Sequence, residues 1–251
     1  MRPTAVVTGA ARRVGRSIAL ELAVHGFDVC VHYRSSSRAA EEVVEACREV
    51  GADAFCAQAD LANGAGCAKL VHAVRERWSS LDVLVNNASL FAPTPFDEID
   101  DAALIQMLEV NLLAPFRLSR DLLPLLRATS ATPGVPEGQG GLVVHLCDIG
   151  AERPVSGYAH YSVSKAGLVM LVRAMAVELA PAVRTVGISP GQVAWPDDYD
   201  PALRAQLTRR IPMGRAGSPQ DVAGLVRFVA LEGHYLNGVV LPVDGGLSAR
   251  Y

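Results

Sequence analysis

The sequence is poor in cysteine, in aromatic residues and in net charge. Its five cysteines include no Cys-x-x-Cys pair, so we expect no metal site or disulfide framework and favour a reducing, cytoplasmic compartment. The 26 acidic and 23 basic residues give a net charge of −3, so neither nucleic acid nor an anionic membrane is an expected partner. No apolar run is long enough to cross a bilayer. The chain enters a strand-like segment within a few residues of Met1, so no signal peptide is expected.

Short β-branched runs alternate with longer amphipathic runs along nearly the whole chain. The alternation predicts an α/β fold with a Rossmann-type, doubly wound parallel sheet of about seven strands and helices on both faces. The expected strands are residues 5–8, 29–32, 54–57, 83–86, 142–146, 185–189 and 239–243. The expected helices are residues 14–25, 38–49, 66–78, 101–127, 158–179 and 219–230. No repeat or linker divides the chain, so we expect one domain over residues 1–251.

A glycine-containing turn separates the first predicted strand from the first predicted helix. It reads Thr8-Gly9-Ala10-Ala11-Arg12-Arg13-Val14-Gly15. Glycine lets the backbone bend tightly and approach a pyrophosphate, whose charge is favoured at a helix N-terminus. The common dinucleotide fingerprint has a further glycine where this chain has Arg13, so a plain turn is the alternative interpretation. The place of the turn between strand and helix favours a nucleotide.

The end of the second predicted strand indicates which nicotinamide cofactor binds. NAD enzymes carry an acidic residue here for the ribose, whereas NADP enzymes carry a cation for the 2′-phosphate. This chain reads His32-Tyr33-Arg34-Ser35-Ser36-Ser37. Arginine can hold a phosphate through two parallel hydrogen bonds, so we expect NADPH/NADP+. A solvated loop that caps the next helix is the other interpretation, and the serines can serve both purposes.

Polar residues also follow the third and fourth predicted strands. Asp60-Leu61 follows the third strand and Asn86-Asn87-Ala88-Ser89 the fourth, at the edge where open α/β sheets bind ligands. Asp60 could equally cap a helix. Asn111 lies within a long predicted helix, where asparagine is a mediocre helix former. It is either a satisfied core side chain or a residue that kinks the helix and holds a water in a proton relay.

Three residues form the expected catalytic group. Lys165 follows Tyr161 by four positions, so both side chains project from one face of a helix. The phenol can act as a general acid, and the ammonium can stabilise its phenolate. With Lys165 and the ribose of a nicotinamide cofactor nearby, we expect the pKa of Tyr161 to be lowered. Asp148 lies thirteen positions before Tyr161, on the strand that leads to this helix. Its carboxyl can face the same pocket and replenish the proton.

Together these motifs resemble the short-chain dehydrogenase/reductase family over nearly the whole chain. They are Thr8-Gly9…Gly15, Asn86-Asn87-Ala88, Asn111, Tyr161-Ser162-Val163-Ser164-Lys165, Ser189-Pro190-Gly191 and Val243-Asp244-Gly245-Gly246. The resemblance implies a nicotinamide cofactor, oligomers built on the two long helices beside the site, and catalysis by Asn111, Tyr161 and Lys165, with Asp148 in the place of the family's serine. With the residues above, it implies these cofactor contacts: Gly9, Arg12, Arg13, Val14, Gly15, His32, Tyr33, Arg34, Ser35, Ser36, Asp60, Leu61, Asn87, Ala88, Ser89, Tyr161, Lys165, Pro190, Gly191 and Val193.

Three departures from the general family pattern resemble the pteridine reductase branch. They are Arg13 in place of a glycine, the run from Asn87 to Pro95 with its Phe91, and Leu146-Cys147-Asp148. In that branch the aromatic residue stacks on the pterin. A phenylalanine tucked against the core is the other interpretation of Phe91. The substrate contacts that this resemblance implies are Arg13, Ser89, Phe91, Asp148 and Tyr161. Trp195, in the segment expected to form a lid, is either a further wall of the pocket or an exposed aromatic residue.

The expected activity is NADPH-dependent reduction of a pterin or dihydropterin, of the dihydrobiopterin, dihydromonapterin or dihydrofolate type. A general carbonyl reductase of the same family is the alternative, and a non-catalytic NADP-sensing protein is a third. A substrate lid is expected at about residues 191–212. The resemblance implies a homotetramer, in which we expect Arg250 or Tyr251 to line a neighbouring subunit's site.

Overall fold

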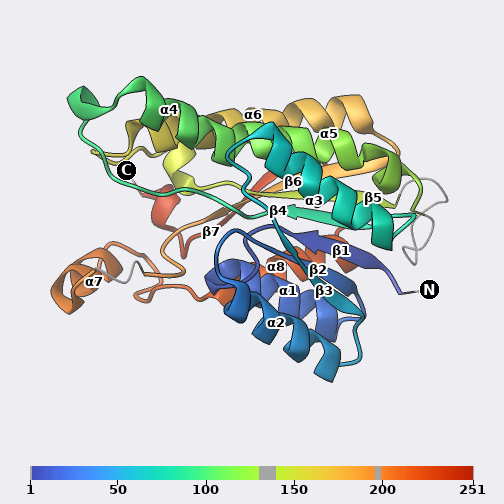
Figure 1. Cartoon of the computed structure of the whole chain (residues 1–251). Coiled ribbons are helices and arrows are strands. Elements are labelled where there is room, and N and C mark those ends of the chain that lie inside the picture. The colour runs from blue at the N-terminus through green and yellow to red at the C-terminus, as the bar shows by residue number, and fades with distance from the viewer. Residues whose placement is uncertain (1, 130–139, 196–198, 251) are drawn as a thin grey trace.

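Seven parallel strands form the centre of the computed structural model, which describes residues 2–129, 140–195 and 199–250. Their order in the sheet is β3-β2-β1-β4-β5-β6-β7, which confirms the expected doubly wound topology (Figure 1). The strands are β1 (Thr4–Val7), β2 (Asp28–Tyr33), β3 (Ala54–Gln58), β4 (Val83–Asn86), β5 (Gly141–Leu146), β6 (Val183–Pro190) and β7 (Val240–Val243). All seven lie within two residues of the expected bounds.

Helices cover both faces of the sheet (Figure 1). The helices on one face are α1 (Arg13–Val24), α2 (Ser37–Glu49) and α8 (Pro219–Leu231). Those on the other are α3 (Gly64–Arg77), α5 (Ala114–Arg127) and α6 (Ala159–Leu179). The strands feed both cores, since Leu142 and Val144 of β5 point to the first face and Val143 to the second. A sheet buried on both sides explains why its strands are continuous apolar runs.

The long helix expected at residues 101–127 is interrupted. It consists of α4 (Asp101–Leu108), a π-helical turn (Glu109–Leu113) and α5, with Asn111 at the centre of the π turn. A π turn inserts a residue into the helical ladder and is common at functional sites. The helix is therefore irregular at Asn111, whose side chain is buried and hydrogen-bonded.

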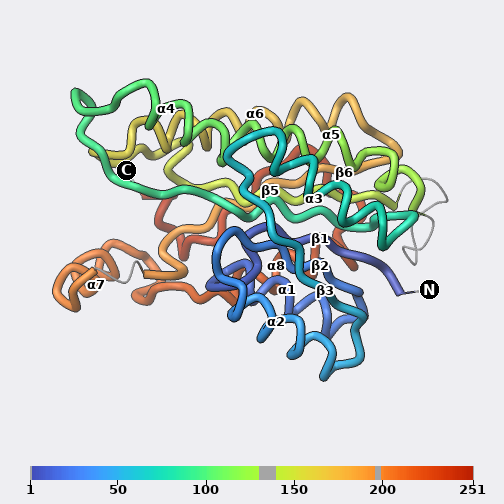
Figure 2. The backbone as a smooth tube through the Cα atoms, viewed as in Figure 1, coloured from blue at the N-terminus to red at the C-terminus, as the bar shows by residue number. Residues whose placement is uncertain are grey.

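Segments from the C-terminal part of the chain lie beside the carboxyl ends of the strands. The helix α7 (Pro201–Thr208) and the C-terminal segment lie on this side of the molecule, whereas the N-terminus lies on the opposite side (Figure 2). Asn63 caps α3 by accepting a hydrogen bond from the Gly66 N–H at 2.9 Å, so Asp60 is not the cap of that helix. Within the described ranges, no helix has the length and apolar character needed to cross a bilayer.

Candidate active site

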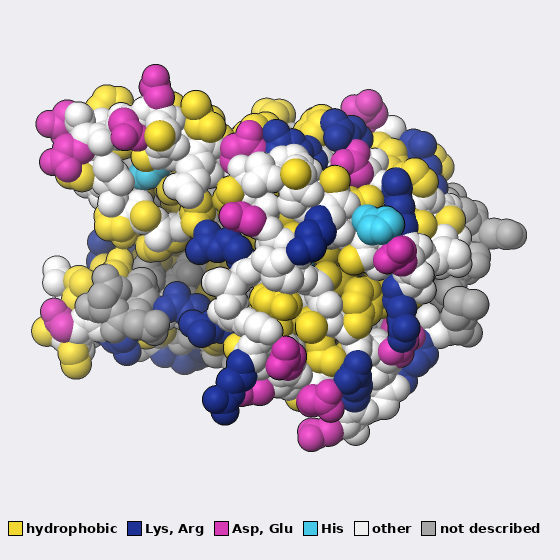
Figure 3. Space-filling model, in the orientation of Figure 1, with side chains coloured by type: hydrophobic (Ala, Val, Ile, Leu, Met, Phe, Trp, Pro, Cys, Tyr) yellow, Lys and Arg dark blue, Asp and Glu magenta, His cyan; other side chains and the backbone are white. Residues whose placement is uncertain are grey.

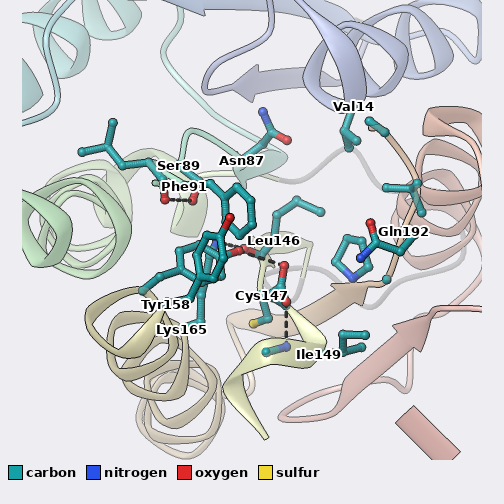
Figure 4. Close-up of a pocket in the computed structure, with 18 of the residues that line it drawn as sticks. Val14, Asn87, Ser89, Phe91, Leu146, Cys147, Ile149, Tyr158, Lys165 and Gln192 are labelled. Atoms are coloured by element: carbon teal, nitrogen blue, oxygen red, sulfur yellow. Dashed lines mark hydrogen bonds between the residues drawn. The ribbon is translucent and has the colours of Figure 1, made fainter. Parts of the chain in front are cut away.

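A cavity of about 1200 Å³ opens along the carboxyl ends of the strands. Pockets for a single small molecule usually enclose about 300–1,000 Å³, so this one has room for a dinucleotide and a second molecule. Figure 4 shows Ser89, Phe91 and Tyr158 on one side of it and Val14 and Gln192 on the other. Open parallel sheets bind their ligands at this edge.

Tyr161, Lys165 and Asp148 meet at the floor of this cavity. The Tyr161 hydroxyl donates a hydrogen bond to Asp148 Oδ2 at 2.8 Å. Lys165 Nζ donates to the Leu146 carbonyl at 2.7 Å and lies 5.7 Å from the centre of the Tyr161 ring. Only 6% of Tyr161 and 3% of Lys165 is exposed, so both polar groups act in a medium of low polarity.

Both oxygens of the Asp148 carboxyl have a partner. Asp148 directly follows β5 and caps a 3-10 turn (Ile149–Ala151), where its Oδ1 accepts a hydrogen bond from the Gly150 N–H at 2.6 Å. A Cβ on Gly150 would lie 2.9 Å from that oxygen, so glycine suits this close contact. One oxygen therefore fixes the carboxyl to the backbone and leaves the other for Tyr161. A serine would have to make both contacts through one oxygen, and it would bring no charge to the site.

The electrostatics of Tyr161 differ from the sequence prediction. Burial, and then the charge of Asp148, raise the pKa of Tyr161 well above its ordinary value, because a phenolate would be poorly solvated and would face a carboxylate. In the protein alone the pKa of Tyr161 is thus raised, whereas the lowered pKa expected beside Lys165 and the nicotinamide ribose stays a prediction. Burial also lowers the pKa of Lys165, while the charge of Asp148 opposes that shift. The site holds Tyr161 as a neutral phenol, which is the form that can give a proton.

Asn111 braces the loop beside this group. Its Oδ1 accepts hydrogen bonds from the Leu90 N–H at 2.8 Å and from the Ser89 hydroxyl at 3.1 Å. Its Nδ2 donates to the Leu90 carbonyl and to Ser164 Oγ, both at 3.0 Å. The side chain thus ties the loop after β4 to α6. The proton-relay role of Asn111 stays a prediction.

The turn after β1 has the conformation that a phosphate site requires. Gly9 has a φ of +63°, and Arg13 has a φ of +50°, a region in which a side chain costs on the order of 1 kcal/mol. A Cβ on Gly15 would lie 2.3 Å from the Gly9 carbonyl oxygen and 2.5 Å from Asn87 Nδ2, so only glycine fits there. Arg13 therefore keeps the backbone shape of the glycine fingerprint while adding a guanidinium to the pocket wall.

His32 holds this turn in place, a role that the sequence analysis missed. His32 Nδ1 accepts a hydrogen bond from the Gly9 N–H at 3.0 Å, and Nε2 lies 3.1 Å from the Ala59 carbonyl, to which it donates. Burial lowers its pKa to about 4, so the ring is neutral with its proton on Nε2. The available signal was a histidine at the end of a buried strand, since the second strand of such a fold lies beside the first strand and the glycine turn that follows it.

The two asparagines after β4 point to different places. Asn87 Nδ2 donates to the Thr8 carbonyl at 2.7 Å, and its backbone N–H donates to Thr8 Oγ1 at 2.9 Å, so it fixes the phosphate turn from the other side. Asn86 instead lies in the core, where its Nδ2 donates to Ser119 Oγ at 3.3 Å. Only Asn87 belongs to the pocket lining.

Most of the residues expected at the site do line the cavity. They are Gly9, Arg12, Arg13, Val14, Gly15, His32, Arg34, Asp60, Leu61, Asn87, Ala88, Ser89, Phe91, Asp148, Tyr161, Lys165, Pro190, Gly191 and Val193. Those found outside its lining are Tyr33, Ser35, Ser36, Asn111 and Trp195. Trp195 packs near Tyr199, with ring centres 6.3 Å apart, and Tyr199 is the one that lines the cavity. The cofactor and substrate contacts of these residues stay predictions.

Phe91 is half exposed and packs against two tyrosines, not against the core. Its ring stacks on Tyr158, with centres 4.5 Å apart and planes at 16°, and meets Tyr161 at 4.9 Å and 81°. Tyr158 was not expected at the site, although it lies only three residues before Tyr161. The three rings form an aromatic wall beside the Tyr161 hydroxyl. Figure 4 shows Phe91 and Tyr158 together on this side of the cavity.

Known proteins resemble this chain over nearly its whole length. A family model described as enoyl-(acyl carrier protein) reductase matches residues 9–248. The chain is 32% identical to 3-oxoacyl-[acyl-carrier-protein] reductase FabG of Staphylococcus aureus (strain Mu50 / ATCC 700699), over 98% of both proteins. It is also 32% identical to pteridine reductase 1 of Leishmania tarentolae, over 98% of this chain and 96% of that protein. The crystal structure of the angucycline C-6 ketoreductase LanV with bound NADP matches with a TM-score of 0.89 at 27% identity, over 99% of this chain and 96% of LanV.

Proposed function

Because this chain belongs to the short-chain dehydrogenase/reductase family, we propose that it is an oxidoreductase that uses NADPH to reduce a pterin or dihydropterin to the tetrahydro form. The observation that carries the substrate assignment is the hydrogen bond from the Tyr161 hydroxyl to Asp148. A carboxyl at this position provides proton chemistry that a serine hydroxyl does not.

NADPH/NADP+ is the cofactor, and the residues at the nucleotide end fit it. Gly9 and Gly15 let the turn at the start of α1 fold closely on itself and against Asn87. A pyrophosphate is favoured at such a helix N-terminus by the backbone N–H groups. Arg34 lines the cavity at the end of β2, where an arginine suits a 2′-phosphate. When bound, the cofactor supplies the hydride.

The chain's own residues supply the proton. Reduction of a C=N bond needs a proton at nitrogen, and the neutral Tyr161 phenol can give it. After the phenol has given its proton, Asp148 can pass a proton from solvent to the Tyr161 oxygen across their hydrogen bond. The Lys165 ammonium, 5.7 Å from the Tyr161 ring centre, stabilises negative charge that develops on the phenol. The aromatic wall of Phe91 and Tyr158 suits a flat heteroaromatic ring.

Reduction of a carbonyl group is the second candidate. The relative FabG has the same identity to this chain as pteridine reductase 1, and LanV is a ketoreductase. Tyr161 could protonate a carbonyl oxygen by the same geometry. A non-catalytic NADP-sensing role is the least supported, since such a protein has no need for Asp148, Tyr161 and Lys165 to be assembled in one buried group.

Further parts of the proposal concern the lid, the assembly and the location. We propose that residues 191–212 close over the substrate, because Gln192, Leu207 and Arg210 line the cavity; residues 196–198 lie outside the described ranges.

We propose a homotetramer because Phe116 of α5 and Met170 of α6 leave large apolar side chains exposed, at 48% and 58%. All five cysteines are free thiols, which fits the proposed cytoplasmic location.

NADPH oxidation across a substrate panel tests the function. The panel comprises dihydrobiopterin, dihydromonapterin, dihydrofolate, a 3-oxoacyl thioester and a simple ketone, each measured with the same protein. We expect a dihydropterin or dihydrofolate to give the highest kcat/KM. A higher kcat/KM with the thioester or the ketone than with every pterin would replace the pterin proposal by the carbonyl one.

A further inference from the structure

Three arginines from separate segments line the outer part of the cavity. Arg153 follows the turn that begins at Asp148, Arg210 follows α7, and Arg250 lies at the C-terminal end. We call these three residues the arginine rim. Arg250 lines the cavity of its own chain. Its expected contact with a neighbouring subunit's site stays a prediction. Tyr251 lies outside the described residues.

Hydrogen bonds to backbone carbonyls join the members of the arginine rim. Arg153 Nη1 donates to the Arg250 carbonyl at 2.9 Å, and Arg250 Nη1 donates to the Arg210 carbonyl at 3.0 Å. These bonds link the loop after Asp148, the end of the lid and the C-terminal segment. They use one nitrogen each of the Arg153 and Arg250 guanidinium groups, and Arg210 takes part through its backbone carbonyl. Because a guanidinium has five N–H donors, Arg153 and Arg250 are held in place and still have donors for a ligand.

Among the described residues, no ion pair balances the charge of the arginine rim. Glu152 also lines the cavity, but no ion pair joins any carboxylate of the described residues to the three guanidinium groups. The whole chain has a net charge of −3, so a group of three cations at one pocket runs against its overall balance. Concentrated charge of one sign at a cleft attracts a ligand of the opposite sign.

The wall next to the arginine rim is apolar and aromatic. It includes Val155, Tyr158, Leu207 and Leu247. Figure 3 shows hydrophobic and Lys or Arg side chains meeting in the hollow between the α4 and α7 regions. Such a surface fits a molecule with an apolar or aromatic body that ends in an anionic group.

We propose that the arginine rim binds a carboxylate or phosphate at the far end of the substrate, and so selects substrates that carry such an anionic tail. The inference rests on the proposed function, because it assumes that the reduced group lies at Tyr161 in the same cavity. Two sources offer this chemistry. One is the glutamate of dihydrofolate, and the other is the phosphate of a phosphopantetheine-linked acyl chain.

Paired substrates test the proposal and distinguish the two sources. The first pair is dihydrofolate and dihydrobiopterin, and the second is a 3-oxoacyl phosphopantetheine and the same 3-oxoacyl group on N-acetylcysteamine. In each pair only the first member has the anionic tail. For whichever pair reacts, Arg153→Gln and Arg250→Gln should each lower the ratio of kcat/KM, anionic over neutral, by about tenfold, as for a lost charge-assisted contact. Added salt should raise KM for the anionic member alone.

Matched variants keep the test specific. Arg38→Gln removes a highly exposed arginine of α2 that is not part of the described pocket lining, and it should leave the ratio unchanged. Arg153→Lys should restore part of the preference. If only the thioesters react, the pterin proposal fails while the arginine rim is still tested. The rim proposal is overturned if the rim variants leave the ratio unchanged, if Arg38→Gln lowers it equally, or if no anionic member is reduced or binds to the NADP+ complex.

Discussion

The hydroxyl of Tyr161 lies 2.8 Å from Asp148 Oδ2 and donates a hydrogen bond to it. The other oxygen of the same carboxyl accepts the Gly150 N–H, so the carboxyl cannot turn away without losing a backbone contact. This relationship joins the residue that gives the proton to a group that can replace it. Burial, and then the charge of this carboxyl, raise the pKa of Tyr161.

Removing the charge of Asp148 should lower the pKa of Tyr161. Asp148→Asn keeps the size of the side chain and can still accept a hydrogen bond, but it takes away the negative charge that opposes ionisation of the phenol. A titration followed by tyrosinate absorbance, with Tyr161→Phe as the reference that isolates this residue, measures the shift. A Tyr161 pKa that stays the same or rises in the variant would show that burial alone controls it.

Arg34 should determine the cofactor preference. Arg34→Asp replaces the cation at the end of β2 by the charge typical of NAD enzymes, so the ratio of kcat/KM for NADPH to that for NADH should fall by about 10- to 100-fold. Arg38→Asp is the control, because Arg38 is highly exposed and lies outside the described pocket lining. Equal efficiency with both cofactors in the parent protein would contradict this account.

The sequence was sufficient for the sheet but not for the contacts that assemble the pocket. Alternating apolar runs predict parallel strands because both faces of such a sheet are buried. The π turn at Asn111 could not be predicted from the sequence, because an inserted residue leaves the apolar pattern intact on either side. The arginine rim could not be predicted either, because Arg153 and Arg250 are 97 positions apart and only the folded chain brings them together. His32 was assigned to the cofactor, whereas its ring nitrogens contact the backbone on both sides.

His32 should make the stability of the protein depend on pH. Burial lowers its pKa from 6.5 to about 4, so the unfolded chain binds its proton more readily. The contribution of the neutral ring is therefore fully present above pH 6.5 and is lost as the pH falls toward about 4, by about 3 kcal/mol in the free energy of unfolding.

Denaturant unfolding between these pH values measures the effect. His145, whose pKa burial lowers to about 3, adds a loss of the same sign, so the comparison must be with a variant. His32→Gln keeps a donor and an acceptor but does not titrate, and its stability should fall less steeply with acidification. The same slope for parent and variant would mean that His32 is protonated equally in both states.

The most direct test of the proposed chemistry is the rate of NADPH oxidation by Asp148→Ser with a dihydropterin and with a ketone or 3-oxoacyl thioester. Serine restores the residue that resembles the general family, so proton delivery to a pterin nitrogen should suffer and carbonyl reduction should not. We predict that kcat for the dihydropterin falls by about 10²–10⁴-fold, the range for a lost acid–base group, while KM for NADPH is unchanged. A variant that reduces the dihydropterin at the parent rate would contradict the role of Asp148 and the pterin assignment that depends on it.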